Sequence, residues 1–278
     1  MARRTRRPSS GSRGSVQAQL IRRVGALVAA LVLAAVAWLS GGELSGGSST
    51  GTAGASAHAT SATISAPATA RTLTPTTWDA DLYPDYYRVA GTAVVDEELQ
   101  PGEVRYAPLD ELGRAGRAVA CVTYDLMDAG SSRERKDMSD LHPAGWGHNE
   151  EVSIPMPSGK SYRGALFNRS HLLAKSLGGE EVLENLVTGT RTQNVGDNRG
   201  DDGGMAYTES LARDWLRDHP EGTVYYAATP VYEGDELLPR SVFVDVRSSD
   251  GSLDLEVEVY NAARGFSIDY ETGEFSES

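Results

Sequence analysis

The sequence predicts a mixed α+β domain built on an antiparallel sheet, and three observations support this fold class. Residues 223–232, 241–247 and 253–260 alternate in polarity, are rich in Val and Tyr, and are separated by Gly and Asp turns, as antiparallel strands are. Residues 205–219 place apolar side chains at helical spacing and end before a proline. Residues 119–126 are apolar and alternating, which predicts a further strand ahead of that helix. Strands on both sides of a helical middle favour the α+β class.

The middle of the chain mixes polar and apolar elements. Residues 110–118 predict a turn and a short helix, and residues 128–159 form a long polar segment. Residues 165–173 are apolar except for an embedded Asn-Arg-Ser-His run at 168–171. Residues 180–195 predict a turn followed by a helix. Polar groups set inside an apolar segment are candidates for function, because burying them costs free energy unless they are paired.

Length and composition fit one well-buried domain. The chain has 278 residues, of which 40% are hydrophobic and 23% charged, so it is not disordered throughout. Residues 78–278 hold 18 basic and 38 acidic side chains, a formal charge of −20. A field of that sign repels polyanions at long range, which argues against a general nucleic-acid coat or a binder of anionic lipid. Cys121 is the only cysteine, which excludes an intrachain disulfide and a Cys-rich zinc site.

The N-terminal part of the chain predicts export. Arginines are concentrated in residues 3–23, and an apolar run follows over residues 24–39. A basic flank before an apolar run is typical of an export signal or an uncleaved signal anchor, here residues 1–40. The basic flank should stay cytoplasmic while the rest of the chain is exported. The pair Arg22-Arg23 leaves a twin-arginine signal open.

A flexible linker is expected between this segment and the folded domain. Residues 41–77 consist mainly of Gly, Ser, Ala and Thr, with few large apolar side chains to bury. We therefore expect three parts: the export segment, the linker, and one folded domain over residues 78–278. The protein is expected to be secreted, or tethered to the outer face of the cytoplasmic membrane if the N-terminal segment is not cleaved.

A set of polar side chains in the middle of the chain suits phosphodiester cleavage. His171 lies in the apolar segment, two asparagines lie within residues 185–194, and Glu209 and Arg213 are one helical turn apart. A neutral imidazole can take a proton from water, amide and carboxylate oxygens suit Mg²⁺, and guanidinium groups hold phosphate. A single amide oxygen anchors a cation weakly, so water and substrate phosphate would complete the metal shell.

The order and spacing of these motifs resemble the DNA/RNA non-specific endonuclease family, and particularly its bacterial DNA-entry nuclease branch. The similarity runs from about Tyr106 to the end of the chain and includes residues 110–114, 143–146 and 269–274 besides the segments above. Several separated motifs in the right order make a specific signal. The resemblance implies a central antiparallel sheet with helices and a ββα-metal finger that carries the active site.

The resemblance also assigns roles to individual residues. The family pattern Asp-Arg-Gly-His falls on Asn168-Arg169-Ser170-His171, which implies that His171 is the general base, that Arg169 is a further catalytic residue, and that Asn168 supports the site. Asn194 matches the family's direct metal ligand, and Asn185 matches an asparagine that supports that site. We expect Asn185 to precede the helix predicted in the later part of residues 180–195, with Gly189 near a break, because Asn185 and Asn194, nine positions apart, would otherwise lie on opposite faces of one helix.

Two further residues complete the implied site. Glu209 matches an acidic residue that binds metal-bound water, and Arg213 matches an arginine that faces the scissile phosphate. The implied cofactor is one Mg²⁺ ion, with Mn²⁺ as an alternative, and no organic cofactor is expected. The implied products carry a 5′-phosphate.

The chain departs from the family pattern at two positions. Asn168 replaces an aspartate, which removes a charge, and Ser170 replaces a glycine, which adds a side chain near the reactive group. Neither change removes the base or the metal ligand, so both bear on rate and substrate preference.

The expected partner is DNA, with RNA left open. Basic residues cluster in sequence around the motifs and predict a local basic groove on an acidic body: Lys160, Arg163, Arg169, Lys175, Arg191, Arg199 and Arg213. Two other functions stay open: a non-catalytic exported protein that kept the fold and binds nucleic acid or a surface partner, and a nuclease toxin. Retention of His171, Asn194 and Glu209 together argues against the first.

Overall fold

A computed structural model describes residues 73–196 and 203–278. The expected export segment and nearly all of the expected linker lie outside the described residues. Within the described ranges, no helix combines the length and the apolar character that a membrane span requires. Thr76 already contacts the domain, because its backbone N–H and hydroxyl both donate to the carboxylate of Glu258.

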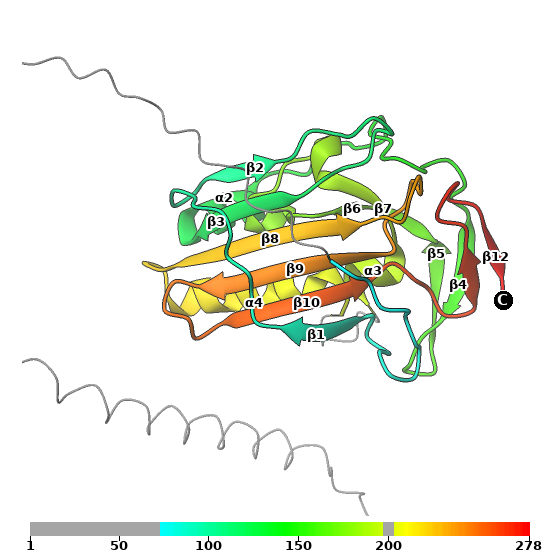
Figure 1. Cartoon of the computed structure of the whole chain (residues 1–278). Helices are drawn as coiled ribbons and strands as arrows, with labels where there is room; N and C mark the ends of the chain where they lie inside the picture. Colours follow the sequence, from blue (N-terminus) through cyan, green and yellow to red (C-terminus); the bar gives the residue numbers. More distant parts are fainter. Residues whose placement is uncertain (1–72, 197–202) are drawn as a thin grey trace, which may run out of the picture. The chain divides into compact units, whose positions relative to one another are not determined.

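A six-stranded antiparallel sheet forms the centre of the domain, in the order β1-β10-β9-β8-β3-β2 (Figure 1). Its strands are β1 Tyr87–Gly91, β2 Val104–Tyr106, β3 Ala118–Thr123, β8 Thr223–Val231, β9 Ser241–Ser248 and β10 Asp254–Tyr260. The three C-terminal strands match the alternating segments, and their register is continuous from β8 through β9 to β10. The prediction of a central antiparallel sheet is therefore confirmed.

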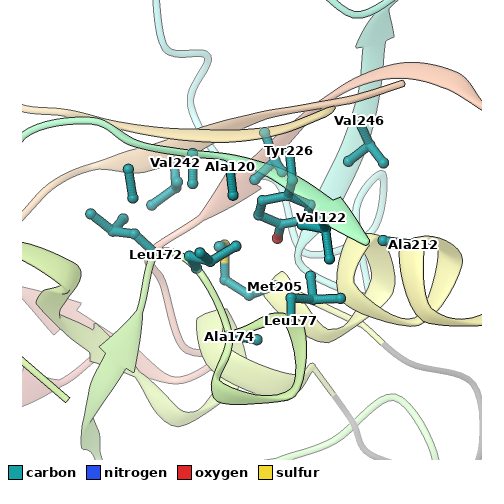
Figure 2. Packing of buried hydrophobic residues seen from close by; sticks show 14 of the residues in the cluster. Ala120, Val122, Leu172, Ala174, Leu177, Met205, Ala212, Tyr226, Val242 and Val246 are labelled. Carbon is teal, nitrogen blue, oxygen red and sulfur yellow. The ribbon is translucent and has the colours of Figure 1, made fainter. Parts of the chain in front are cut away.

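Helix α4 (Met205–Asp218) packs against the sheet and confirms the predicted amphipathic helix. Its buried residues include Met205, Thr208, Ala212 and Leu216, which recur at helical spacing. Figure 2 shows Met205 and Ala212 facing the core beside Tyr226 of β8. Leu172 and Leu177 belong to the same buried cluster, so the segment that contains them packs on this apolar layer.

Three two-stranded sheets surround the central one: β4 Glu151–Pro155 with β5 Ser161–Ala165, β6 Phe167–His171 with β7 Leu186–Thr190, and β11 Phe266–Ile268 with β12 Phe275–Glu277. Helix α3 (Arg191–Val195) follows β7 directly. Two short 3-10 helices, η1 (Lys175–Leu177) and η2 (Leu183–Asn185), lie between β6 and β7. The β6-β7-α3 unit is the ββα element that the resemblance implied.

The chain between β2 and α2 differs from the prediction in two places. Residues 110–118 contain a turn and no helix, because the Asp110 carboxylate accepts hydrogen bonds from the backbone N–H groups of Leu112 and Arg114. The strand predicted over residues 119–126 ends at Thr123, and helix α2 (Tyr124–Ser132) begins there. Thr123 is the reason, since its hydroxyl caps the helix by accepting from Leu126 N–H.

The helix predicted within residues 180–195 is also only partly right. Leu186–Thr190 forms strand β7, and the helix is confined to Arg191–Val195. The antiparallel register with β6, which pairs Ser170 with Val187, holds this segment extended. Asn185 therefore precedes a strand, and Gly189 lies inside it.

Candidate active site

One cavity of about 720 Å³ gathers most of the predicted site residues. Asn168, Arg169 and His171 reach it from β6, Asn194 from α3, and Glu209 from α4. These residues come from three separate elements and are brought together by the fold. Asn185 and Arg213 do not line the cavity; Arg213 contacts the lining residues Ser176 and Glu209.

His171 is the last residue of strand β6, and its partly buried side chain lines the cavity. Burial lowers the pKa of His171 from 6.5 to about 4; Glu181 opposes this shift, and Arg135 and Arg133 reinforce it. The imidazole is therefore neutral at physiological pH and able to accept a proton. Its Nε2 atom is buried without a hydrogen-bond partner.

Asn185 holds the backbone immediately after His171. Its side chain is fully buried, and its Oδ1 accepts from the backbone N–H of Leu173 at 2.8 Å. Its Nδ2 donates to the carbonyls of Leu173 and Glu180, each at 2.9 Å. The amide is thus committed to backbone groups, and its contacts support the His171 end of the β6-β7 pair.

The side chain of Ser170 points into the protein interior. Ser170 is fully buried, and its hydroxyl donates to Oδ1 of Asn194 at 3.4 Å. Gly189, which pairs with Asn168, is a diagonal neighbour of Ser170, and a Cβ added there would come within 2.8 Å of the Ser170 Cβ and 2.3 Å of Gln193 Oε1. The serine that replaces the family's glycine therefore fits because this diagonal neighbour on β7 is itself a glycine.

Glu209 and Arg213 are neighbours on one face of α4, as their spacing predicts. Arg213 Nη1 lies 3.6 Å from Glu209 Oε2. The same nitrogen donates to the hydroxyl of Ser176 at 2.8 Å, and Nη2 donates to Ser210 at 2.7 Å. Because Ser176 lines the cavity, Arg213 reaches the cavity edge while it orients the Glu209 carboxylate.

Arg169 has most of its guanidinium committed within the protein. Its Nε donates to the carbonyl of Leu141, and its Nη2 donates to the carbonyl of Ser139 at 2.9 Å. The guanidinium also stacks on the ring of Trp146, 4.2 Å from its centroid. Arg169 therefore connects residues 139–146 to β6. Arg169 and Trp146 pack against each other and both line the cavity.

We expect Arg169→Lys to lower the free energy of unfolding by about 2 kcal/mol, because an ammonium cannot make both hydrogen bonds and the stacking contact. Thermal denaturation beside Arg217→Lys on the exposed face of α4 measures the difference. An unchanged melting temperature together with a raised KM would contradict this assignment and indicate a direct phosphate contact.

Sequence reasoning missed three charged residues of the cavity. Glu181 lies in the wall almost fully buried, with its carboxylate 3.3 Å from Arg133 Nη2. Arg135 and Lys136 form part of the basic rim. The basic run at residues 133–136 is a signal that could have found the two rim residues, whereas the position of Glu181 beside His171 depends on tertiary folding.

The predicted basic groove is confirmed only in part. Arg169 and Lys175 line the cavity. Arg191 instead stacks over the ring of Tyr162 on β5, 5.2 Å from its centroid. Arg199 lies outside the described residues.

The donor set in the cavity fits a hard cation held by few protein ligands. Across residues 73–196 and 203–278, no group of three or more His, Cys, Asp or Glu side chains could enclose a metal ion. Asn194 offers an amide oxygen and Glu209 a carboxylate to the cavity, whereas the Glu181 carboxylate, which also lines it, is paired with Arg133. Oxygen donors suit Mg²⁺, which keeps several water ligands.

Comparisons with known proteins identify relatives of this chain in sequence and in fold. A family profile described as DNA/RNA non-specific endonuclease matches residues 104–276. A deoxyribonuclease of Streptococcus dysgalactiae subsp. equisimilis is 34% identical over 240 residues, which cover 69% of this chain and 72% of that protein. The structure of Sda1 nuclease with a bound zinc ion aligns with a TM-score of 0.69 and 35% identity, covering 73% of this chain and 100% of the other.

A third protein shares the fold at lower identity. NucA from Streptococcus agalactiae, solved with a magnesium ion bound, aligns with a TM-score of 0.54 and 23% identity over 69% of this chain and 88% of the other. The profile match covers more than half of the chain and includes the whole β6-β7-α3 unit. The chain therefore belongs to the DNA/RNA non-specific endonuclease family.

Proposed function

We propose that this protein is an exported, metal-dependent endonuclease that hydrolyses phosphodiester bonds of DNA with little sequence preference and leaves 5′-phosphate ends. The observation that carries the proposal is the meeting, in one cavity, of a neutral histidine with the oxygens of Asn194 and Glu209. A protein that only binds nucleic acid has no need for a base beside a cation site. Whether the protein also cleaves RNA is decided by the cleavage experiment described below.

His171 acts as the general base in this proposal. Because Nε2 is buried and has no partner, Nδ1 is the nitrogen that takes the proton from the attacking water. The tautomer with its proton on Nε2 leaves the Nδ1 lone pair available. Asn185 keeps the ring in place through the backbone of Leu173.

The cation site supplies the second half of the chemistry. Asn194 would hold one Mg²⁺ through its amide oxygen, and the Glu209 carboxylate would accept hydrogen bonds from the surrounding water. The metal, when bound, neutralises charge on the phosphate and on the departing 3′ oxygen. Arg213 holds Glu209 in place, and Arg135 and Lys136 at the rim attract the polynucleotide backbone towards the cavity.

Magnesium is the cofactor that the donor chemistry favours, with Mn²⁺ as the alternative. Of the two relatives with a named metal, one holds zinc and the other magnesium. Zinc sites in proteins are usually built from Cys, His and carboxylate ligands. An amide oxygen and one carboxylate suit Mg²⁺ better.

Cleavage of supercoiled plasmid and of single-stranded RNA, with and without a chelator, tests the proposal. Nicking that stops with chelator and returns with Mg²⁺ supports it. DNA binding without cleavage under any divalent metal would reject it in favour of a binding protein. N-terminal sequencing of the exported protein decides between a cleaved signal and a membrane tether.

The pH dependence of cleavage should report the lowered pKa of His171. The base is active when neutral, so kcat/KM should stay high as the pH falls through 6.5 and drop only near pH 4. The folded state binds fewer protons than the unfolded chain in this interval, so stability should also decrease as the pH falls from 6.5 towards 4. Initial rates over pH 4–8 at saturating Mg²⁺ measure the profile. A midpoint near 6.5 would contradict a desolvated base.

A further inference from the structure

Helix α3, which carries Asn194, is too short to hold its own position. It spans only Arg191–Val195, and a helix of this length leaves most of its backbone groups without intrahelical partners. The placement of Asn194 must therefore come from contacts outside the helix. The Ser170 hydroxyl on β6 reaches Asn194 itself, and the other side-chain contacts that hold α3 are made by Thr190 and Thr192, where β7 ends.

Thr190 is the central residue of this junction. It is fully buried, and its hydroxyl accepts from the backbone N–H of Gln193 at 3.0 Å, which caps α3. The same hydroxyl donates to the carbonyl of Ala262 at 2.9 Å. The hydroxyl of Thr192 also donates to Ala262. Two threonines thus fasten the first turn of α3 to one carbonyl beyond the end of β10.

Asn261 fastens the same junction from the other side. It is fully buried, and its Oδ1 accepts from the backbone N–H of Thr190 at 2.7 Å. Its Nδ2 donates to the carbonyls of Thr188 at 3.1 Å and Pro239 at 2.9 Å. Because Asn261 directly follows β10, these bonds tie the ββα unit to the central sheet.

Two buried asparagines therefore hold opposite ends of one strand pair. Asn185 holds the backbone after His171, and Asn261 holds the backbone where α3 begins. We propose that Thr190 and Asn261 are positioning residues for the cation site, which place the Asn194 oxygen without touching metal or substrate. This inference rests on the proposed role of Asn194 as metal ligand.

Loss of the Thr190 contacts should weaken metal binding by a measurable factor. Supporting contacts behind a metal ligand typically change affinity by 10-fold to 100-fold when they are lost. Thr190→Val keeps the shape of the side chain and removes the cap and the bond to Ala262, so we expect Mn²⁺ binding about tenfold weaker. Thr190→Ser keeps the hydroxyl and should bind Mn²⁺ as the wild type does.

Titration with Mn²⁺ alone, followed by the electron paramagnetic resonance signal of the free ion, measures this affinity without nucleic acid. The matched control is Thr123→Val, which removes an equivalent threonine cap from α2. Thr123→Val should cost similar thermal stability and leave Mn²⁺ affinity unchanged. Thr192→Val removes one of the two bonds to Ala262 and should give a smaller loss of affinity, which keeps the test decisive if Thr190→Val does not fold.

The outcomes separate this inference from the proposed function. If Asn194→Ala abolishes Mn²⁺ binding while Thr190→Val and Thr192→Val bind as tightly as the wild type, the positioning role is rejected and the ligand assignment stands. If Asn194→Ala binds Mn²⁺ as the wild type does, the ligand assignment fails. Equal weakening by Thr123→Val and Thr190→Val would show that general stability sets the affinity, and this would also overturn the inference.

Discussion

His171→Ala should reduce the rate of plasmid nicking by about a thousandfold, while Mn²⁺ binding stays at the wild-type level. The reduction is that expected for loss of a positioned general base, which contributes roughly 10²- to 10⁴-fold. The metal affinity is preserved because the cation site is held from α3 and α4, and His171 lies on β6. Single-turnover cleavage at saturating Mg²⁺ measures the effect.

His219→Ala is the matched control for this experiment. His219 lies at the end of α4, where it is exposed and stacks on Trp215. Its removal should leave the rate unchanged. Undiminished cleavage by His171→Ala would eliminate the imidazole as the base, and parallel losses in both variants would point to damage of the fold. A thermal melt of each variant distinguishes these cases.

Asn194→Ala should abolish detectable Mn²⁺ binding and lower cleavage by about a hundredfold or more at millimolar Mg²⁺. The expected loss is large because Asn194 supplies the proposed direct metal ligand, and removal of even a supporting contact costs up to about 100-fold. The Glu209 carboxylate remains in the cavity but would act only through water. Chelator added to the wild-type protein should reproduce the same loss.

Asn194→Asp is the informative partner of that variant. An aspartate keeps an oxygen at the same place and adds a negative charge, so Mn²⁺ should bind at least as tightly as in the wild type. Metal-dependent cleavage that survives in Asn194→Ala, with an unchanged Mg²⁺ requirement, would move the cation site elsewhere. The asparagine variants and the His171 variant together separate the two halves of the proposed chemistry.

The regular elements of the C-terminal half could be predicted from the sequence. The alternating segments became β8, β9 and β10, and the amphipathic segment became α4. Period-2 and period-3.6 patterns are local, and each of these elements is long enough to show its own pattern. The six-stranded order and the place of β3 next to β8 depend on long-range pairing that no local pattern records.

The elements around the site were harder to predict because they are short. Leu186–Thr190 was predicted as part of a helix, and pairing with β6 makes it a strand. Residues 124–126 were predicted as strand, and the Thr123 cap begins α2 there. In segments of about five residues, tertiary pairing or a single cap outweighs local propensity.

By itself, the sequence determined which side chains are candidates for the proposed chemistry: His171, Asn194 and Glu209 stand in recognisable motifs, and the structure places all three in one cavity. Only the tertiary structure decided which contacts the surrounding side chains make. Arg169 is committed to the carbonyls of the 139–146 loop, and Glu181 reaches the cavity beside His171. Asn261 secures a helix that lies far from it in the chain. The physical reason is that donors and acceptors pair with whatever the fold brings within about 3 Å, and that choice is made across the whole chain.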